Sequence, residues 1–180
     1  MNAAELVNKW RHVLYATEMI WSWTEPASLA YWAEMASTRN KIIEIGTHLG
    51  KSAKVMLLAN PNCRLWCIDG WHEPGTEHTA RHFLKAEIDE GRCEGYRINF
   101  PHNAVCPWNA KAPFDMVVID NGHEYEEVKN QIELFRPLIR SGGLICGHDL
   151  DPGNGVHKAV TELIPDYTEP VPRVWAKVMT

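Results

Sequence analysis

The chain of 180 residues is long enough to bury a substantial core within one domain, and its length predicts no second domain. Its net charge of −5 lacks the basic excess that nucleic-acid binding requires, which favours a small-molecule partner. Five cysteines show neither a CxxC pair nor zinc spacing, and no apolar run reaches the roughly 18 to 20 residues of a membrane span. We therefore expect a cytoplasmic protein with reduced thiols and no nucleic-acid or membrane partner, while a homo-oligomer stays compatible with the sequence.

Helical and strand patterns alternate along the chain, which predicts an α/β fold with a doubly wound, mostly parallel sheet and helices on both faces. The helices expected cover residues 24–37, 51–59, 76–89, 125–139 and 155–164. The strands expected cover residues 41–45, 64–70, 95–99, 114–122 and 141–149, with an antiparallel edge strand at 172–179. We expect one domain, 1–180, in which a helical, aromatic-rich cap (1–40) precedes an α/β core (41–180).

The ends of two helices are predicted from particular residues. Thr24 is a suitable N-cap for the helix that follows it, because Pro26 then falls in the first turn, where proline is tolerated. Apolar residues at intervals of three and four extend the helix after residue 125 to Ile139, with a bend at Pro137.

Three of the expected strands end in an acidic residue that precedes a turn: Glu44, Asp69 and Asp120. In an open parallel sheet, ligands bind outside the carboxyl ends of the strands, at the point where the strand order reverses. These acids should therefore share one edge of the sheet. Gly46 allows the backbone to approach a ligand closely, and Gly50 allows the next helix to begin beside it.

The glycine turn fits two phosphate-binding motifs poorly. A P-loop has four residues between its glycines, whereas GTHLGKS has three, and a dinucleotide fingerprint has glycine where His48 stands. Asp69 ends the second strand, 23 residues after Gly46, where a carboxylate can accept both hydroxyls of a ribose. The pattern predicts a ligand with a nucleoside and no required pyrophosphate; an aspartate that only caps a turn is the alternative.

Three segments, EIGTHLGKSA, LWCIDGW and FDMVVIDNGHEYEEVKNQIELFRPLIRSGGLICGHD, resemble class I S-adenosylmethionine-dependent methyltransferases. Within this class they look most similar to the small-molecule O-methyltransferases grouped with macrocin and mycinamicin sugar methyltransferases and, more distantly, to catechol O-methyltransferase. The resemblance covers about residues 25–178, and its most specific part is the D-x-x-H-x-Y block with the helix and strand after it. It implies a Rossmann-like fold and methyl transfer to a small-molecule hydroxyl, with a small-molecule acceptor as partner.

The resemblance also implies which residues bind S-adenosylmethionine. His48 and Ser52 would lie near the methionine carboxylate, Asp69 would hold the ribose, and Trp71 would lie against the adenine, with ordinary packing as the alternative for the tryptophan. The full set expected at the cofactor is Glu44, Gly46, Thr47, His48, Gly50, Ser52, Asp69, Gly70, Trp71 and Asp120. Which of Asn99, His102 and Asn103 faces the adenine stays open.

The resemblance makes His123, three residues after Asp120, the expected catalytic base, a role that suits an imidazole near neutral pH. A histidine that only caps the next helix is the alternative. His148 and Asp149 end the fifth strand and should approach Asp120, so that the three could hold a divalent ion, magnesium in the related enzymes. His148 departs from the oxygen ligand usual there, which leaves Mg, Mn or hydrogen bonding alone open.

Other functions stay compatible with the sequence. One is a nicotinamide-dependent oxidoreductase on a similar sheet, and another is a non-catalytic domain that binds S-adenosylmethionine for assembly or sensing. A nucleic-acid methyltransferase is disfavoured by the absence of a basic patch and of an [Asp/Asn]-Pro-Pro-aromatic motif. Trp10, Trp21, Trp23 and Trp32 precede the first strand, and this segment is the expected place for acceptor contact, against plain core packing or a dimer interface.

Overall fold

The computed structural model describes residues 1–99 and 107–180. Its helices are α1 (Ala3–Ala16), α2 (Pro26–Ala36), α3 (Lys51–Ala59), α4 (Thr76–Phe83), α5 (Lys85–Asp89), α6 (Tyr125–Phe135) and α7 (Gly155–Leu163), with short 3₁₀ helices η1 (Pro107–Lys111) and η2 (Arg136–Leu138). Its strands are β1 (Lys41–Ile45), β2 (Arg64–Asp69), β3 (Cys93–Arg97), β4 (Phe114–Ile119), β5 (Ile139–Gly147), β6 (Thr168–Val171) and β7 (Val174–Val178).

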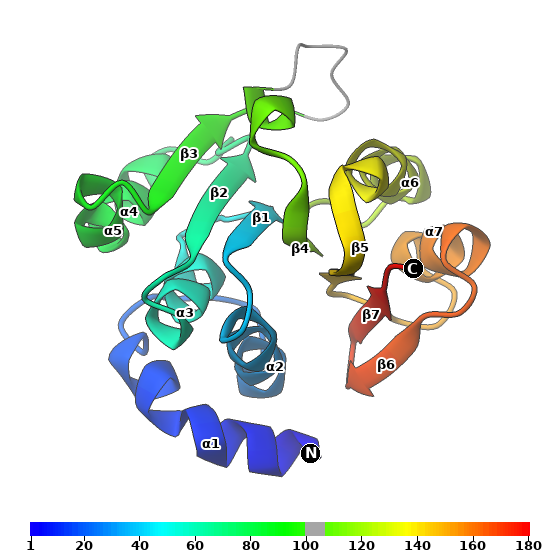
Figure 1. The fold of residues 1–180 in the computed structure, drawn as a ribbon, viewed down its shortest axis with the longest axis horizontal. Coiled ribbons are helices and arrows are strands. Elements are labelled where there is room, and N and C mark those ends of the chain that lie inside the picture. The colour runs from blue at the N-terminus through cyan, green and yellow to red at the C-terminus, as the bar shows by residue number, and fades with distance from the viewer. Residues whose placement is uncertain (100–106) are drawn as a thin grey trace.

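Within the described residues, seven strands form one sheet in the order β3-β2-β1-β4-β5-β7-β6 (Figure 1). The pairs β1/β2, β1/β4, β2/β3 and β4/β5 are parallel, whereas β7 runs antiparallel between β5 and β6. The strand order reverses between β1 and β4, which is where a doubly wound sheet opens its binding crevice. The expected Rossmann-like fold, with its antiparallel C-terminal strand, is confirmed.

The sheet is buried on both faces, which explains why its strands read as continuous apolar runs. Ile42 and Ile43 are adjacent in β1 and both fully buried, yet they belong to separate core clusters on opposite faces. One cluster contains Trp32 of α2 and Met56 of α3, and the other contains Val128 of α6. Figure 1 shows α1, α2 and α3 on one side of the sheet and α6 and α7 on the other.

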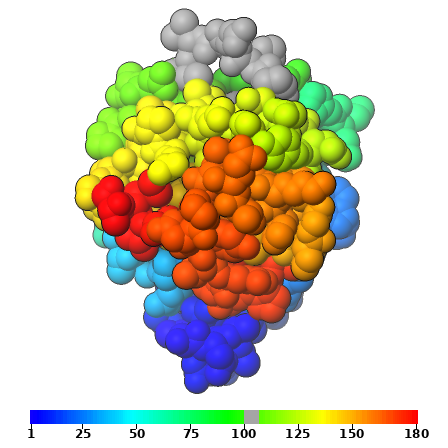
Figure 2. Space-filling view, turned by 90° about the vertical axis from the view of Figure 1, so that its right-hand side faces the viewer, coloured from blue at the N-terminus to red at the C-terminus, as the bar shows by residue number. Residues whose placement is uncertain are grey.

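The two ends of the chain lie beside these layers. Helix α1 begins with a capping box between Asn2 and Glu5 and buries Leu6, Trp10 and Val13. It packs against α2 (Figure 1). Figure 2 shows the C-terminal α7 and the β6–β7 hairpin, in orange and red, covering one flank of the molecule above the N-terminal helix in blue. None of the helices in the described ranges is long and apolar enough to cross a membrane.

Two predicted helix ends are wrong for identifiable reasons. Helix α2 has Glu25, not Thr24, as its N-cap residue, and no side chain caps it because the Glu25 carboxylate binds His148. The helix after the fourth strand ends at Phe135, since a 3₁₀ turn with proline near its start follows, and Ile139 begins the next strand.

Smaller differences concern segments with weak sequence patterns. The helix expected over 76–89 is two helices, α4 and α5, separated at Leu84. The third strand lies at 93–97, two residues earlier than expected, and neither the bounds of α1 nor the short strand β6 were predicted. Four of the five cysteines are free and buried as expected, namely Cys63, Cys67, Cys93 and Cys146. Cys106, His102 and Asn103 lie outside the described residues.

Candidate active site

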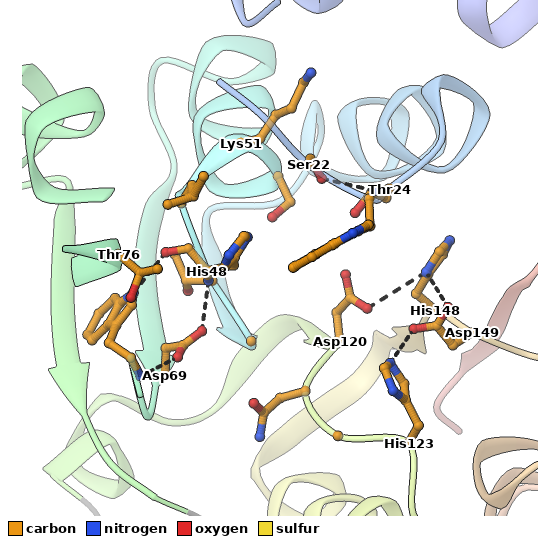
Figure 3. A pocket seen from close by; sticks show the side chains of 18 of the residues that line it. Ser22, Thr24, His48, Lys51, Asp69, Thr76, Asp120, His123, His148 and Asp149 are labelled. Atoms are coloured by element: carbon orange, nitrogen blue, oxygen red, sulfur yellow. Dashed lines mark hydrogen bonds and ion pairs between the residues drawn. The ribbon is translucent and has the colours of Figure 1, made fainter. Parts of the chain in front are cut away.

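A cavity of about 630 Å³ opens at the carboxyl ends of the central strands, where the strand order reverses. Its walls come from the turn after β1, the loop after β2, the loops after β4 and β5, the segment before α2, and the tip of the β6–β7 hairpin. Figure 3 shows Asp69, His48 and Thr76 on one side of the cavity, and Asp120, His123, His148 and Asp149 on the other. The space is in the range of small-molecule sites.

The turn after β1 depends on glycine at its first position. Gly46 has φ +95°, and a Cβ atom there would lie 2.1 Å from the carbonyl oxygen of Asp120. Glycine therefore lets the ends of β1 and β4 close together beneath the cavity. Gly50, with φ +88°, then admits the start of α3 against Leu84.

Glu44 lies beneath this turn and does not line the cavity. Its side chain is fully buried, Oε2 accepts a 2.9 Å hydrogen bond from the Thr47 hydroxyl, and Oε1 has no hydrogen-bond partner among the described residues. Burial raises the pKa of this carboxyl to about 8, and the nearby charges of Asp120 and Asp69 act in the same direction. Glu44 is therefore an uncharged acid at neutral pH that joins the strand to the turn.

Asp69 connects two loops of the cavity wall. Its Oδ2 accepts a hydrogen bond of 2.7 Å from the His48 backbone, and its Oδ1 accepts one of 2.6 Å from the Trp71 backbone. The indole nitrogen of Trp71 donates to the His48 carbonyl at 2.8 Å. Gly70 lies between them, and a Cβ atom there would come within 2.4 Å of the His72 ring. The carboxylate is thus fixed at the cavity wall. Each of its oxygens keeps a second lone pair that can accept a hydrogen bond from a ligand.

Asp120, His148 and Asp149 come together as predicted, with one ligand atom of each within 4.8 Å of the others. Although burial of the His148 ring lowers its pKa, the hydrogen bond to Asp149 and the charges of Asp120, Asp149 and Glu25 raise it above the usual imidazole value. Burial also raises the pKa of Asp120, to about 6, against the opposing charge of His148.

Asp149 is held ionised by its neighbours. Burial alone would raise its pKa, but the His148 hydrogen bond and the charges of His148, His123 and Arg173 lower it to about 2. His123 Nε2 lies 2.7 Å from Asp149 Oδ2, and Arg173 Nη2 lies 2.5 Å from Asp149 Oδ1. A neutral His123 with its hydrogen on Nε2, toward Asp149, would keep its lone pair on Nδ1.

The four non-glycine residues with positive φ in the described ranges all line the cavity: His48, Trp71, Asp149 and Arg173, with φ between 41° and 65°. Such conformations each cost on the order of 1 to 3 kcal/mol and persist where the surrounding structure holds them. Their grouping around one cavity makes it the candidate functional site.

The segment before α2 contributes exposed aromatic residues to the cavity mouth. Trp23 lines the cavity and stacks on His48, with ring centroids 4.8 Å apart, and Trp21 contacts Trp23 edge-on. Both indoles are more than half exposed, whereas Trp10 and Trp32 are buried in the core. The N-terminal tryptophans are thus divided between core packing and the cavity mouth.

Most of the residues predicted from the sequence line the cavity: Gly46, Thr47, His48, Ser52, Asp69, Trp71, Asp120, His123, His148 and Asp149. Glu44, Gly50 and Gly70 support the walls without lining them. Sequence reasoning missed His72, Thr76 and Arg173 as lining residues, and Glu25 as a partner of His148. The arginine follows a proline in a weak C-terminal pattern, and the glutamate adjoins an expected helix start, so neither gave a local signal.

An open sheet in this order, with a cavity at the reversal of strand order that is lined by Asp69, Asp120 and Asp149, is the Rossmann-like arrangement of S-adenosylmethionine-dependent methyltransferases. The particular family follows from a direct comparison. Residues 43–150 match the model of a methyltransferase domain family, and the chain belongs to that family. It is an enzyme of the methyltransferase class, which overturns the nicotinamide-dependent alternative.

Solved structures share the fold at low identity. The O-methyltransferase TomG from Streptomyces achromogenes, involved in tomaymycin synthesis, is 18% identical, with a TM-score of 0.65 over 98% of this chain and 90% of its own. The Podospora anserina methyltransferase PaMTH1 is 13% identical, with a TM-score of 0.64 over 97% of this chain and 87% of its own. A protein described as a caffeoyl-CoA O-methyltransferase from Staphylococcus aureus is 17% identical, with a TM-score of 0.63 over 94% of this chain and 90% of its own. No curated protein matches the chain.

Proposed function

We propose that the protein transfers the methyl group of S-adenosylmethionine to a hydroxyl oxygen of a small molecule. The observation that carries this proposal is the division of one cavity into two chemically different sides. One side carries Asp69 and backbone groups suited to a nucleoside, and the other carries Asp120, His123 and Asp149, which suit proton removal. The similarity in fold to three proteins described as methyltransferases, two of them O-methyltransferases, agrees with it.

The cofactor would bind on the Asp69 side. The second lone pairs of the Asp69 oxygens would accept the ribose hydroxyls, and Trp71 would lie by the adenine. His48 and Ser52, with Thr47, would face the methionine part. Gly46, Gly50 and Gly70 would let the backbone approach it, and Glu44 would act on it only through the turn. Asp120 would lie between cofactor and acceptor.

Methyl transfer is an in-line displacement. The acceptor oxygen forms a bond to the methyl carbon while the carbon–sulfur bond breaks. The electron pair of the broken bond stays on sulfur, which becomes a neutral thioether. The hydroxyl proton must leave, and His123 Nδ1 would accept it while Nε2 lies 2.7 Å from the Asp149 carboxylate. The charge of Asp149 would then stabilise the imidazolium that forms.

Asp120 is the second candidate for the base. Among the described residues its carboxylate accepts no hydrogen bond, and its pKa of about 6 is suited to proton transfer near neutral pH. A comparison of His123→Ala with Asp120→Asn would assign the base. We include no divalent ion, because the Arg173 guanidinium already lies 2.5 Å from Asp149 Oδ1 and its positive charge opposes a second cation there.

The acceptor would enter beside the N-terminal segment. Ser22, Trp23 and Thr24 line this part of the cavity, and an indole face suits the flat face of a phenol or of a sugar ring. The resemblance to macrocin and mycinamicin enzymes favours a sugar hydroxyl, and the similarity in fold to a protein described as a caffeoyl-CoA O-methyltransferase favours a phenol.

The test combines binding and turnover. S-adenosylhomocysteine should bind in calorimetry and NADH should not, and labelled methyl should pass from S-adenosylmethionine to a sugar or a phenol in an acceptor panel. The matched variant His123→Ala should retain S-adenosylhomocysteine binding and lose transfer. Cofactor binding without transfer to any acceptor would instead support the non-catalytic alternative.

A further inference from the structure

Side chains of the protein itself already bind both oxygens of Asp149. Arg173 Nη2 lies 2.5 Å and His148 Nδ1 3.2 Å from Oδ1, and His123 Nε2 lies 2.7 Å from Oδ2. A divalent cation would take a lone pair of the same oxygens at about 2.0 to 2.6 Å. Oδ1 already faces two positively charged or donor groups, so an ion could reach only the second lone pair of Oδ2, close to the positive charge of the guanidinium that opposes it.

His148 faces a carboxylate at each of its ring nitrogens. Its Nε2 lies 2.8 Å from Glu25 Oε2, so the ring is between two carboxylates, one at each nitrogen. An ion could therefore reach Nε2 only by displacing Glu25, and Nδ1 faces the same Asp149 oxygen that the guanidinium binds. Of the three expected ligands, Asp120 alone has a carboxylate that accepts no hydrogen bond in the described part of the chain, and one carboxylate is a poor divalent site.

Arg173 is fixed where it stands. Its guanidinium binds Glu25 Oε1 at 2.8 Å and Asp151 Oδ2 at 2.9 Å in addition to Asp149. Its backbone has φ 65° at the tip of the hairpin, and its carbonyl accepts a 3.0 Å hydrogen bond from Leu150. A planar group with five donors matches several carboxylates at once, and strained backbone is retained where a position matters.

We propose that Arg173 is the resident cation of this site and that the Asp120–His148–Asp149 cluster is not a divalent-metal centre. Arg173 is a positioning residue: it neutralises and orients Asp149, which in turn orients His123. Methyl transfer by this chain is then independent of magnesium and manganese. The part that concerns transfer rests on the proposed function, whereas the metal-binding part does not.

The acceptor class follows from the same geometry. A metal-dependent site favours acceptors with two adjacent oxygens, because both can bind the ion. A site with a fixed guanidinium and a histidine base has no such requirement. Acceptors with a single hydroxyl should therefore be methylated as well as matched acceptors with two adjacent hydroxyls.

Manganese binding, read by electron paramagnetic resonance with S-adenosylhomocysteine present, tests the assignment. Wild-type protein should bind no stoichiometric Mn²⁺, and Arg173→Ala should bind it about tenfold tighter or more, the scale on which neighbours change a metal site. Arg173→Lys, which keeps the charge, should resemble wild type. Arg140→Ala is the matched control, because Arg140 forms a similar ion pair with Asp115 outside the cavity.

Transfer in the presence of EDTA is the second readout. Unchanged turnover of wild-type protein in EDTA supports the assignment. If Arg173→Ala fails to fold, the wild-type protein alone still tests the assignment, through its turnover in EDTA and its lack of bound Mn²⁺. One Mn²⁺ ion bound by wild-type protein and lost in Asp149→Asn overturns it, as does turnover that EDTA abolishes and Mg²⁺ restores. If no variant methylates any acceptor while the manganese results hold, the proposed function fails and the cation assignment stands.

Discussion

Glu44→Gln should make the protein more stable at neutral pH. The carboxyl has an ordinary pKa of 4.5 and a pKa of about 8 in the folded state, because burial disfavours its charged form. Below pH 4.5 both states are protonated, and this group contributes no pH dependence. Between 4.5 and about 8 only the unfolded state ionises, so the free energy of unfolding falls as pH rises, and above 8 it levels off.

The size of the effect follows from the shift. At about 1.4 kcal/mol per pKa unit, the change from 4.5 to about 8 corresponds to a loss of about 5 kcal/mol at high pH and about 3 kcal/mol at pH 7. The group is fully buried, so solvent does not screen this value. The amide introduced by Glu44→Gln keeps the shape of the carboxyl, accepts the Thr47 hydrogen bond and cannot ionise.

Urea unfolding of both proteins at constant ionic strength measures the difference. The stability of wild type relative to Glu44→Gln should fall by about 1.4 kcal/mol per pH unit between about pH 5 and 7.5. Glu87→Gln is the contrasting control: Glu87 is also buried but binds Lys54 at 2.6 Å, so its replacement should destabilise the protein. Parallel stability curves for wild type and Glu44→Gln from pH 5 to 8 would refute an uncharged, buried Glu44.

Three further variants test the two sides of the cavity. Asp69→Ala should weaken S-adenosylhomocysteine binding about 10- to 100-fold in calorimetry, since it removes charged hydrogen-bond acceptors worth about 1.5 to 3 kcal/mol; unaltered affinity would remove the ribose role. His123→Ala should slow transfer about 10²- to 10⁴-fold in a labelled-methyl assay without weakening cofactor binding, and Asp120→Asn should slow it less; the reverse order would make Asp120 the base. Trp23→Ala should raise the acceptor KM about 2- to 10-fold, as the loss of one aromatic contact predicts; an unchanged KM would exclude acceptor stacking.

The sequence is informative where local pattern and burial agree. KIIEI and FDMVVI are continuous apolar runs because both faces of the central strands are covered, and an acid lies near the carboxyl end of each, Asp120 in the cavity lining and Glu44 buried beneath it. Their places at one edge of the sheet could therefore be predicted, as could the meeting of Asp120 with His148 and Asp149.

Long-range partners could not be predicted. Glu25 lies 123 residues from His148 and 148 residues from Arg173, and no local rule joins them. The same contacts made Thr24 the wrong choice of N-cap, because Glu25 begins the helix while its side chain serves the cavity. The failures at this helix and at Arg173 thus have one cause, a charged network assembled only by the fold.

The cavity concentrates conformations and charges that oppose stability, and the two cores make them tolerable. A left-handed backbone at Arg173 or Trp71 costs on the order of 1 to 3 kcal/mol, whereas a fully buried Ile42 or Trp32 contributes about 1.5 to 3 kcal/mol or more. The substitution Arg173→Gly would relieve the backbone strain but remove the guanidinium that neutralises Asp149. Stability and function therefore conflict at these positions. For that reason backbone strain and uncompensated burial identify the site here more specifically than the glycine turn does.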